Sequence, residues 1–137
     1  MKVLCFYADH FSYTIGDKNH EAADEAALPG RFTACIVAYI HVEEEDEALD
    51  LRSREKKLSN HLKWVARKNN SQQIVLHSFA HLSDSKASIH FTRELFAATR
   101  ARLQNGDYQV AETPFGYFLN LNMEAPGHSM ARIWADL

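Results

Sequence analysis

RFTACIVAYIHV, residues Arg31–Val42, is apolar through most of its length and rich in β-branched and aromatic side chains. The later segment QIVLHSF, Gln73–Phe79, has the same character. Continuous apolar runs of this kind are typical of strands covered on both faces. Between the two segments, leucines and a valine recur at helical spacing from Leu49 to Val65. We therefore predict a strand–helix–strand unit with parallel strands and a right-handed crossover.

The helix of this unit is preceded by a run of acidic residues at Glu43–Glu47. Basic residues gather instead in its later turns, at Lys56, Lys57, Lys63, Arg67 and Lys68. This distribution suits the helix macrodipole, whose amino-terminal end favours negative charge. We therefore interpret the acidic run as the solvent-exposed start of the helix rather than as a metal site.

Further elements are indicated on both sides of this unit. They are a buried strand at Val3–Ala8, a short strand around Tyr13–Ile15, a helix capped by Ser83 or Asp84 and ended by Asn105-Gly106, strands at Tyr108–Ala111 and Gly116–Glu124, and one or two helical turns after Pro126. The predicted fold class is α/β: a single domain over residues 1–137, with a mixed β-sheet and two main helices.

Composition excludes several classes of protein. The chain has 137 residues, enough for one domain with its own core. Its 15 basic and 18 acidic side chains give a net charge of −3, whereas a surface that coats nucleic acid needs a basic excess. Two cysteines are too few for a disulfide framework. No apolar stretch reaches the roughly 20 residues of a membrane span, so we expect no membrane association and a cytoplasmic location.

Histidine is abundant, with eight in the chain, and one position stands out. His81 follows the strand end at Phe79 and precedes the capped start of a helix, where ligands of open α/β sheets bind. The helix end would disfavour the imidazolium and leave a neutral ring able to accept a proton or orient a water molecule. The alternative is a histidine that only hydrogen-bonds a carbonyl in a turn. His77 and His81 have HxxxH spacing, but the pair straddles a strand end and lacks a third ligand, so we expect no metal.

A turn with proline and glycine forms a second candidate site, in the segment TPFGYF, Thr113–Phe118. The proline fixes the turn, and Gly116 would let a ligand approach the backbone closely. The aromatic rings of the segment either stack on a nucleic-acid base or pack in the core. The chain has no GxSxG, GxGxxG or Walker motif, so a serine nucleophile elbow and the common nucleotide-phosphate loops are unsupported.

These segments resemble one known family from end to end. The matching segments are, in chain order, Met1–Leu4, Asp9–Tyr13 with Asp17-Lys18, Ala38–Glu43, Phe79–Ser83 (FAHLS), Pro114–Tyr117 (PFGY) and Gly127-His128. The FAHLS and PFGY segments are the most specific of them. Together they resemble the archaeal threonyl-tRNA synthetase editing domain, a relative in fold of the D-aminoacyl-tRNA deacylases.

The resemblance implies a hydrolytic function on tRNA. The family hydrolyses the ester of L-serine wrongly attached to threonine tRNA, so the implied partners are the 3′ aminoacyl end of tRNA, a second copy in a homodimer, and a synthetase catalytic chain or domain. It implies neither a metal nor a cofactor, since the terminal 2′-hydroxyl and protein groups position the attacking water. By matching position, the implied residues are His81 as the catalytic candidate, Ala80, Phe115, Gly116 and Tyr117 around the aminoacyl group, and Val42 and Glu43 near the terminal adenosine.

Three positions depart from the family pattern. Leu119 stands where the family carries a catalytically important lysine, Arg132 where it carries a carboxylate, and Ser78 where it carries a proline. Losing one donor to a developing negative charge commonly costs on the order of 10²–10³ in rate. We expect an aminoacyl-tRNA deacylase in which His81 or a nearby basic side chain substitutes, or whose pocket takes a different amino acid. The alternatives are a catalytically weak or inactive module that binds the tRNA end or the synthetase, and a purely structural dimerisation domain.

Overall fold

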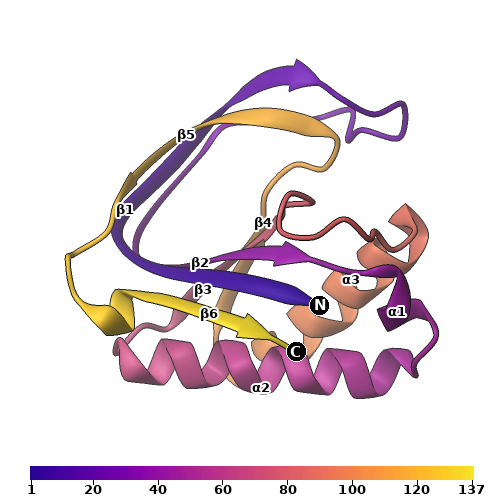
Figure 1. The fold of residues 1–137 in the computed structure, drawn as a ribbon. Helices are drawn as coiled ribbons and strands as arrows, with labels where there is room; N and C mark the ends of the chain where they lie inside the picture. Colours follow the sequence, from indigo (N-terminus) through magenta and orange to yellow (C-terminus); the bar gives the residue numbers. More distant parts are fainter.

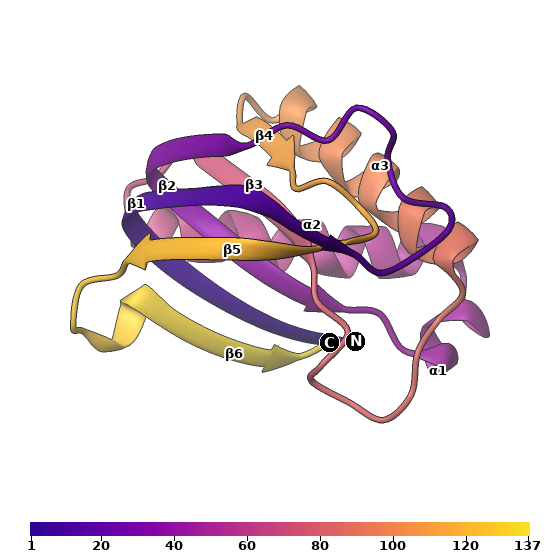
Figure 2. The same ribbon diagram turned by 90° about the horizontal axis from the view of Figure 1, so that it is seen from above.

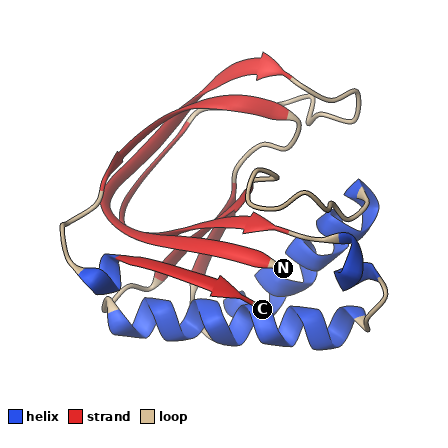
Figure 3. Ribbon diagram, viewed as in Figure 1, coloured by secondary structure: helices blue, strands red, loops and turns tan.

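A curled, six-stranded mixed β-sheet carries the fold, and two long helices lie against one of its faces (Figures 1 and 3). The computed structural model describes all residues, 1–137. Its elements, in chain order, are β1 (Lys2–Lys18), β2 (Gly30–His41), α1 (Glu44–Glu47), α2 (Leu51–Lys68), β3 (Gln73–Ser78), α3 (Ile89–Asn105), β4 (Gln109–Glu112), β5 (Tyr117–Glu124), the 3₁₀ turn η1 (Ser129–Ala131) and β6 (Arg132–Asp136). None of the helices combines the length and the apolar character that crossing a membrane requires.

The predicted strand–helix–strand unit is confirmed as β2–α2–β3. β2 and β3 pair in parallel, with Cys35 opposite Gln73 and Ile40 opposite Ser78. β4 continues the parallel pairing beyond β3, whereas β1 runs antiparallel to β2, β5 and β6. The sheet is therefore mixed, in the order β4-β3-β2-β1-β5 with β6 also on β1, in agreement with the predicted α/β class.

β1 is the longest strand, and its two halves hold different partners. Along one edge it pairs with β2 from Lys2 to Tyr13. Along the other edge its first half pairs with β6 and its second half, from His10 onward, with β5 (Figure 2). The prediction of separate strands at Val3–Ala8 and Tyr13–Ile15 is wrong, because β2 also pairs with His10–Ser12 between them and keeps the strand continuous.

Both faces of the central strands are buried, which explains their continuous apolar sequence. The face under the helices holds a core of 16 buried residues, which includes Ile36, Ala38, Ile40, Leu58, Leu62, Ile74, Leu76, Leu95 and Leu103. The opposite face, inside the curl of the sheet in Figure 1, holds a second cluster, which includes Phe11, Tyr13, Cys35, Val37, Tyr39 and Val75. The two cysteines are buried and free, so they act as small apolar side chains.

The acidic run does not begin the long helix. It forms the separate short helix α1, and α2 begins after Asp50, whose side chain accepts a hydrogen bond from the amide of Ser53. Glu43 and Asp46 are buried, so the interpretation of the run as a solvent-exposed helix start is wrong for these two carboxylates. They turn inward because both bind the buried Met1 ammonium group, at 2.8 Å from Glu43 and 3.3 Å from Asp46.

This ammonium group joins the two chain ends to the start of the helical layer. Arg54 of α2 lies 2.9 Å from Asp46 and donates to the carbonyl of Leu137 at 2.6 Å. The amide of Leu137 in turn donates to the carbonyl of Met1 at 2.8 Å, and Figure 2 shows the two termini side by side. Burial raises the pKa of Glu43. Hydrogen bonds from the Met1 ammonium group, Ser83 and Lys2 outweigh this effect and lower the pKa to about 2.

We expect Glu43→Gln to lower the free energy of unfolding at pH 7 by about 3 kcal/mol, because it leaves a buried ammonium group without one of its counter-charges. The carboxylate stabilises the fold above its ordinary pKa of 4.5, and this contribution is lost as the pH falls toward about 2. Urea unfolding is followed by circular dichroism at pH 7 and pH 3. The difference in free energy of unfolding between the parent protein and Glu43→Gln should be smaller at pH 3. Glu44→Gln, at an exposed neighbour, is the control, and equal losses in the two variants would contradict the assignment.

The start of α3 differs from the prediction. Ser88 caps the helix, and its hydroxyl accepts a hydrogen bond from the amide of Phe91 at 3.2 Å. Ser83 instead donates its hydroxyl to Glu43 at 2.7 Å, so neither Ser83 nor Asp84 caps α3. A longer loop between β3 and α3 results, and this loop forms part of the site described below.

α3 ends at Asn105-Gly106 as predicted, and a positive φ of 67° follows at Asp107. The tail after Pro126 forms a single 3₁₀ turn and then a strand, β6, instead of continuing as a helix. The strand is explained by the open edge of β1 and by the alternation of exposed and half-buried side chains along Arg132–Asp136.

Candidate functional site

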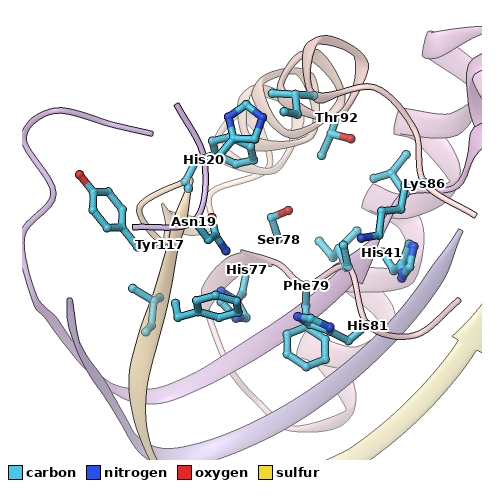
Figure 4. Close-up of a pocket in the computed structure, with 18 of the residues that line it drawn as sticks. Asn19, His20, His41, His77, Ser78, Phe79, His81, Lys86, Thr92 and Tyr117 are labelled. Carbon is cyan, nitrogen blue, oxygen red and sulfur yellow. The ribbon is translucent and has the colours of Figure 1, made fainter. Parts of the chain in front are cut away.

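A cavity of about 460 Å³ opens where β2 and β3 end. Four segments line it: the ends of these strands, the loop between β3 and α3 with the first turns of α3, the turn between β4 and β5 that continues into β5, and the residues just after β1 (Figure 4). Parallel strands present their carboxyl ends at one edge of a sheet, which is where the sequence predicted a ligand site.

Residues far apart in the sequence meet in this cavity. Ala80 and His81 line it from the β3–α3 loop, and Phe115, Gly116 and Tyr117 line it from the turn before β5. The structure therefore brings the catalytic candidate His81 and the four residues predicted around the aminoacyl group together in one cavity. Their roles toward a ligand stay predictions.

Only one of the two residues predicted near the terminal adenosine lines the cavity. Val42 lines the cavity, but Glu43 does not. The carboxylate of Glu43 turns to Met1 and to the hydroxyl of Ser83. Glu43 thus reaches the site only through the loop that it anchors.

His81 lies exposed at the cavity rim, where its ring meets the ring of Phe79 edge-on at 4.9 Å between centroids. The prediction that a helix starts directly after His81 is wrong, because α3 begins only at Ile89 and is capped by Ser88. What places His81 is the loop itself.

His41 holds this loop with both nitrogens of its buried imidazole. The amide of Leu82 donates to Nδ1 at 2.9 Å, so Nδ1 carries no proton and Nε2 donates to the carbonyl of Ser85 at 2.6 Å. The loop is also pinned at its two ends, since the amides of Phe79 and Ala87 donate to carbonyls of β2 and the residue after it, each at 3.0 Å. His41 lies in the matching segment Ala38–Glu43, but its role was not predicted, because it depends on backbone groups of a loop distant in the chain.

A second histidine, His77, forms part of the cavity floor. Its Nδ1 lies 2.8 Å from the hydroxyl of Thr113, and its ring packs edge-on against Tyr39 at 5.1 Å. Burial lowers the pKa of His77 to about 4, so the ring is uncharged at neutral pH. His77 and His81 do not belong to any group of three or more histidine, cysteine or carboxylate side chains that could hold a metal ion.

We expect the buried His77 to make the fold acid-sensitive. Its pKa is about 4 in the folded protein and about 6.5 when unfolded, so the unfolded chain binds the proton more readily and stability falls as the pH drops from 6.5 toward 4. Between pH 7 and pH 4.5 this contribution amounts to about 2 kcal/mol. Between pH 7 and pH 4.5, the free energy of unfolding measured in urea should fall by this amount less in His77→Gln than in the parent protein. The exposed control His10→Gln should lose as much as the parent. An equal loss in His77→Gln and the parent would contradict the role of His77 in acid sensitivity.

Gly116 serves the chain itself and not only a ligand. Its φ is +88°, and a Cβ atom there would lie 2.5 Å from the Cβ of Ala23. The predicted reason for this glycine, close approach of a ligand, is therefore incomplete, because the segment after β1 fills that space. The amide of Asn19 donates to the carbonyl of Gly116 at 2.8 Å and completes the contact.

Asp24 joins the same segment to the turn before β5. Its carboxylate accepts from the amide of Phe115 at 2.9 Å and pairs with Arg93 of α3 at 2.9 Å, and its carbonyl accepts from the hydroxyl of Tyr117 at 2.8 Å. Arg93 also lies over the ring of Phe115, 4.9 Å from its centroid. These contacts fix Phe115 and Tyr117 in the cavity wall, and no sequence motif pointed to Asp24.

The charge in the cavity is unusual, because Lys86 is its only lysine or arginine and no carboxylate lines it. Figure 4 shows the side chain of Lys86 turned toward the cavity from the β3–α3 loop. Leu119, at the position where the resemblance implies a lysine, also lines the cavity and leaves that part of the wall apolar. Arg132 lies elsewhere, where it donates to the carbonyl of Pro126 at 2.7 Å.

Solved structures of the same architecture define the class of fold. The chain superposes on the c-Myc DNA unwinding element binding protein with a TM-score of 0.69 at 14% identity, over 100% of this chain and 99% of that one. It superposes on a protein described as a probable eukaryotic D-amino acid tRNA deacylase with a TM-score of 0.58 at 11% identity, over 99% and 98% of the two chains. The fold is that of the D-aminoacyl-tRNA deacylase-like proteins.

Sequence comparison then identifies the family. The model of the archaea-specific editing domain of threonyl-tRNA synthetase matches residues 1–137, and the chain belongs to this family, as its motifs predicted. The threonine–tRNA ligases of Pyrococcus furiosus and Methanococcus maripaludis are 29% identical over 136 residues and 27% identical over 133 residues, each match covering 97% of this chain. The chain spans only 22% and 21% of the length of these two relatives.

Proposed function

We propose that this chain is an aminoacyl-tRNA editing domain that hydrolyses the ester between a mischarged amino acid and the 3′ end of a tRNA. The observation that carries the proposal is that Phe79–His81 and Pro114–Tyr117, from the two most specific family segments, line one cavity. Its volume of about 460 Å³ lies within the range of small-molecule sites. The cavity suits an aminoacyl group with its terminal nucleoside rather than the body of a tRNA.

The proposed substrate is L-serine on threonine tRNA. A synthetic site gains only about 1–3 kcal/mol of discrimination from a single missing methylene, so a second site that destroys the error is needed. With a net charge of −3, this chain has little capacity to hold a whole tRNA by itself. We therefore include among its partners a threonyl-tRNA synthetase catalytic chain or domain.

A homodimer is also part of the proposal. β5 pairs with β1 along one edge and leaves its other edge open. Phe118 and Leu121 on this strand are exposed by 54% and 42%. An open strand edge with exposed apolar side chains favours pairing with another chain.

The proposed reaction uses one water molecule and no metal or cofactor. Water attacks the carbonyl carbon of the ester, the bond to the ribose oxygen breaks, and this oxygen leaves with a proton as free L-serine forms. The 2′-hydroxyl of the terminal ribose helps to position the water, as the family resemblance implies. His81 at the rim is the candidate for accepting the proton of the water, since a neutral imidazole offers one acceptor nitrogen.

Lys86 is the candidate for the positive charge that Leu119 cannot provide. A cation near the ester oxygen stabilises the negative charge that develops in the transition state, and it is most effective in a cavity without competing carboxylates. The backbone on both sides of Lys86 is held, through the carbonyl of Ser85 and the amide of Ala87. This anchoring limits how far the ammonium group can move from the cavity.

The proposed function is tested by incubating the protein with seryl- and threonyl-esters of threonine tRNA. We expect loss of the seryl ester at least tenfold faster than in buffer, with a smaller effect on the threonyl ester, measured by the release of labelled amino acid. His81→Ala should slow the seryl reaction. No acceleration at a high concentration of protein would contradict the enzymatic function.

Lys86→Met should lower the turnover number for the seryl ester on the order of 10²-fold, with little change in KM, because the cation acts on charge that exists only in the transition state. Lys57→Met, at an exposed position of α2 outside the cavity, is the matched control and should retain full activity. Leu119→Lys added to Lys86→Met should restore part of the rate. A double variant no faster than Lys86→Met would contradict the placing of Leu119 at the position of the family lysine.

The alternative is a catalytically weak or inactive module that binds a tRNA end or a synthetase. The observation in its favour is the apolar side chain of Leu119 in the cavity wall. Such a module would bind aminoacyl-tRNA without accelerating hydrolysis. A purely structural dimerisation domain would do neither, so the ester assay together with a binding measurement separates all three.

A further inference from the structure

His77 is a buried, uncharged histidine in the cavity floor that the reaction proposed above does not use. Three contacts fix its ring: the hydroxyl of Thr113 at 2.8 Å from Nδ1, the ring of Tyr39 at 5.1 Å and the ring of Phe79 at 5.8 Å. Thr113 is itself buried, and its amide donates to the carbonyl of Leu76 at 3.0 Å. The orientation of the imidazole is therefore set by the fold before any ligand arrives.

The second nitrogen of His77 distinguishes it from the other buried histidine of the site. His41 uses both ring nitrogens within the protein, on Leu82 and Ser85, as expected for a structural histidine. In His77 only Nδ1 has a protein partner, and the residue lines the cavity. Nε2 is not one of the buried atoms that lack a partner, so it is accessible and free to bind a group that enters the cavity.

A hydroxyl group is the ligand chemistry that matches this nitrogen best. The hydroxyl of Thr113 can either donate to Nδ1 or accept from it, so Nε2 can either carry a proton or lack one. A hydroxyl can both donate and accept and fits either state, whereas a methyl group would leave the nitrogen unpaired. An ammonium group fits only one state, and the cation of Lys86 in the same cavity disfavours a second positive charge nearby.

We propose that Nε2 of His77 binds the side-chain hydroxyl of the amino acid, so that this residue makes the pocket selective for hydroxyl amino acids over aliphatic ones of similar size. The inference rests on the proposed editing function and adds a specificity-determining residue to it. A site built to bind a hydroxyl rejects analogues that lack it, because the ligand then displaces water from the nitrogen without replacing the hydrogen bond. Loss of one such neutral hydrogen bond corresponds to about a tenfold change in discrimination.

The test compares seryl and alanyl esters of the same tRNA, which differ by a single hydroxyl. We expect the ratio of their kcat/KM values to favour serine at least tenfold in the parent protein and to fall about tenfold in His77→Phe, which keeps a ring but removes both nitrogens. A ratio is independent of the fraction of folded protein, so a merely structural role would not change it. Equal loss for the two esters would overturn the inference and would assign His77 to the attacking water or to the fold.

Two further variants keep the test decisive if His77→Phe does not fold. Thr113→Val has nearly the same shape and removes only the partner of Nδ1, so it should lower the ratio, and Thr113→Ser should retain it. His61→Phe is the control, because this half-buried histidine packs on Trp64 outside the cavity. An unchanged ratio in Thr113→Val would exclude the proposed hydrogen bond without any measurement on His77→Phe.

A binding measurement separates failure of this inference from failure of the editing function. Adenosine that carries serine or alanine through a 3′ amide instead of an ester does not undergo the hydrolysis, so its Kd can be measured by calorimetry. We expect the seryl compound to bind at least tenfold more tightly than the alanyl compound and to shift the ¹⁵N resonance of His77 Nε2. Absence of ester hydrolysis would refute the editing function alone, whereas equal Kd values would refute the role of His77 even if both esters were hydrolysed.

Discussion

The parallel pairing of β2 with β3 is the constraint on which the site depends. Tyr39 lies opposite His77 and Ile40 opposite Ser78, so the chain leaves both strands at the same edge of the sheet. The segment after β3 must then cross the end of β2 on its way to α3. His41, at the last position of β2, meets it there and binds it on both ring nitrogens. The cavity is what remains between this fastened loop and the turn before β5.

The sequence predicted those features that depend on local pattern. Apolar continuity identified β2 and β3, and the intervening helical period identified α2, because strands buried on both faces cannot alternate. The long-range choices were not predictable in this way. Ser83 and Ser88 are both good capping residues by type, and only the buried carboxylate of Glu43 decides that Ser83 turns away from the helix. β6 likewise depends on an open edge of β1, although its alternation was a usable signal.

The candidate site shows the same division. The residues of FAHLS and PFGY were found because their side chains carry a recognisable motif, and Phe79–His81 and Pro114–Tyr117 of these motifs do line one cavity. His41, Asp24 and Lys86 were missed, since each acts through a partner or a space that only the folded chain creates. Glu43 was placed near a ligand together with Val42 by matching position in the family, but consecutive residues at a strand end point in different directions. Its partner is the Met1 ammonium group.

The buried carboxylates near the end of β2 lie outside the cavity, so they do not compete with a ligand for the positive charge inside it. The buried carboxylates Glu43 and Asp46 are neutralised by the Met1 ammonium group and Arg54, outside the cavity. The cavity itself keeps one lysine, Lys86, and no carboxylate, so no anionic side chain opposes a phosphate or a developing oxyanion there. An acidic chain can therefore present a locally positive pocket. The net charge of −3 limits how much RNA the domain can hold, but it does not determine the sign of the field that a terminal nucleotide meets.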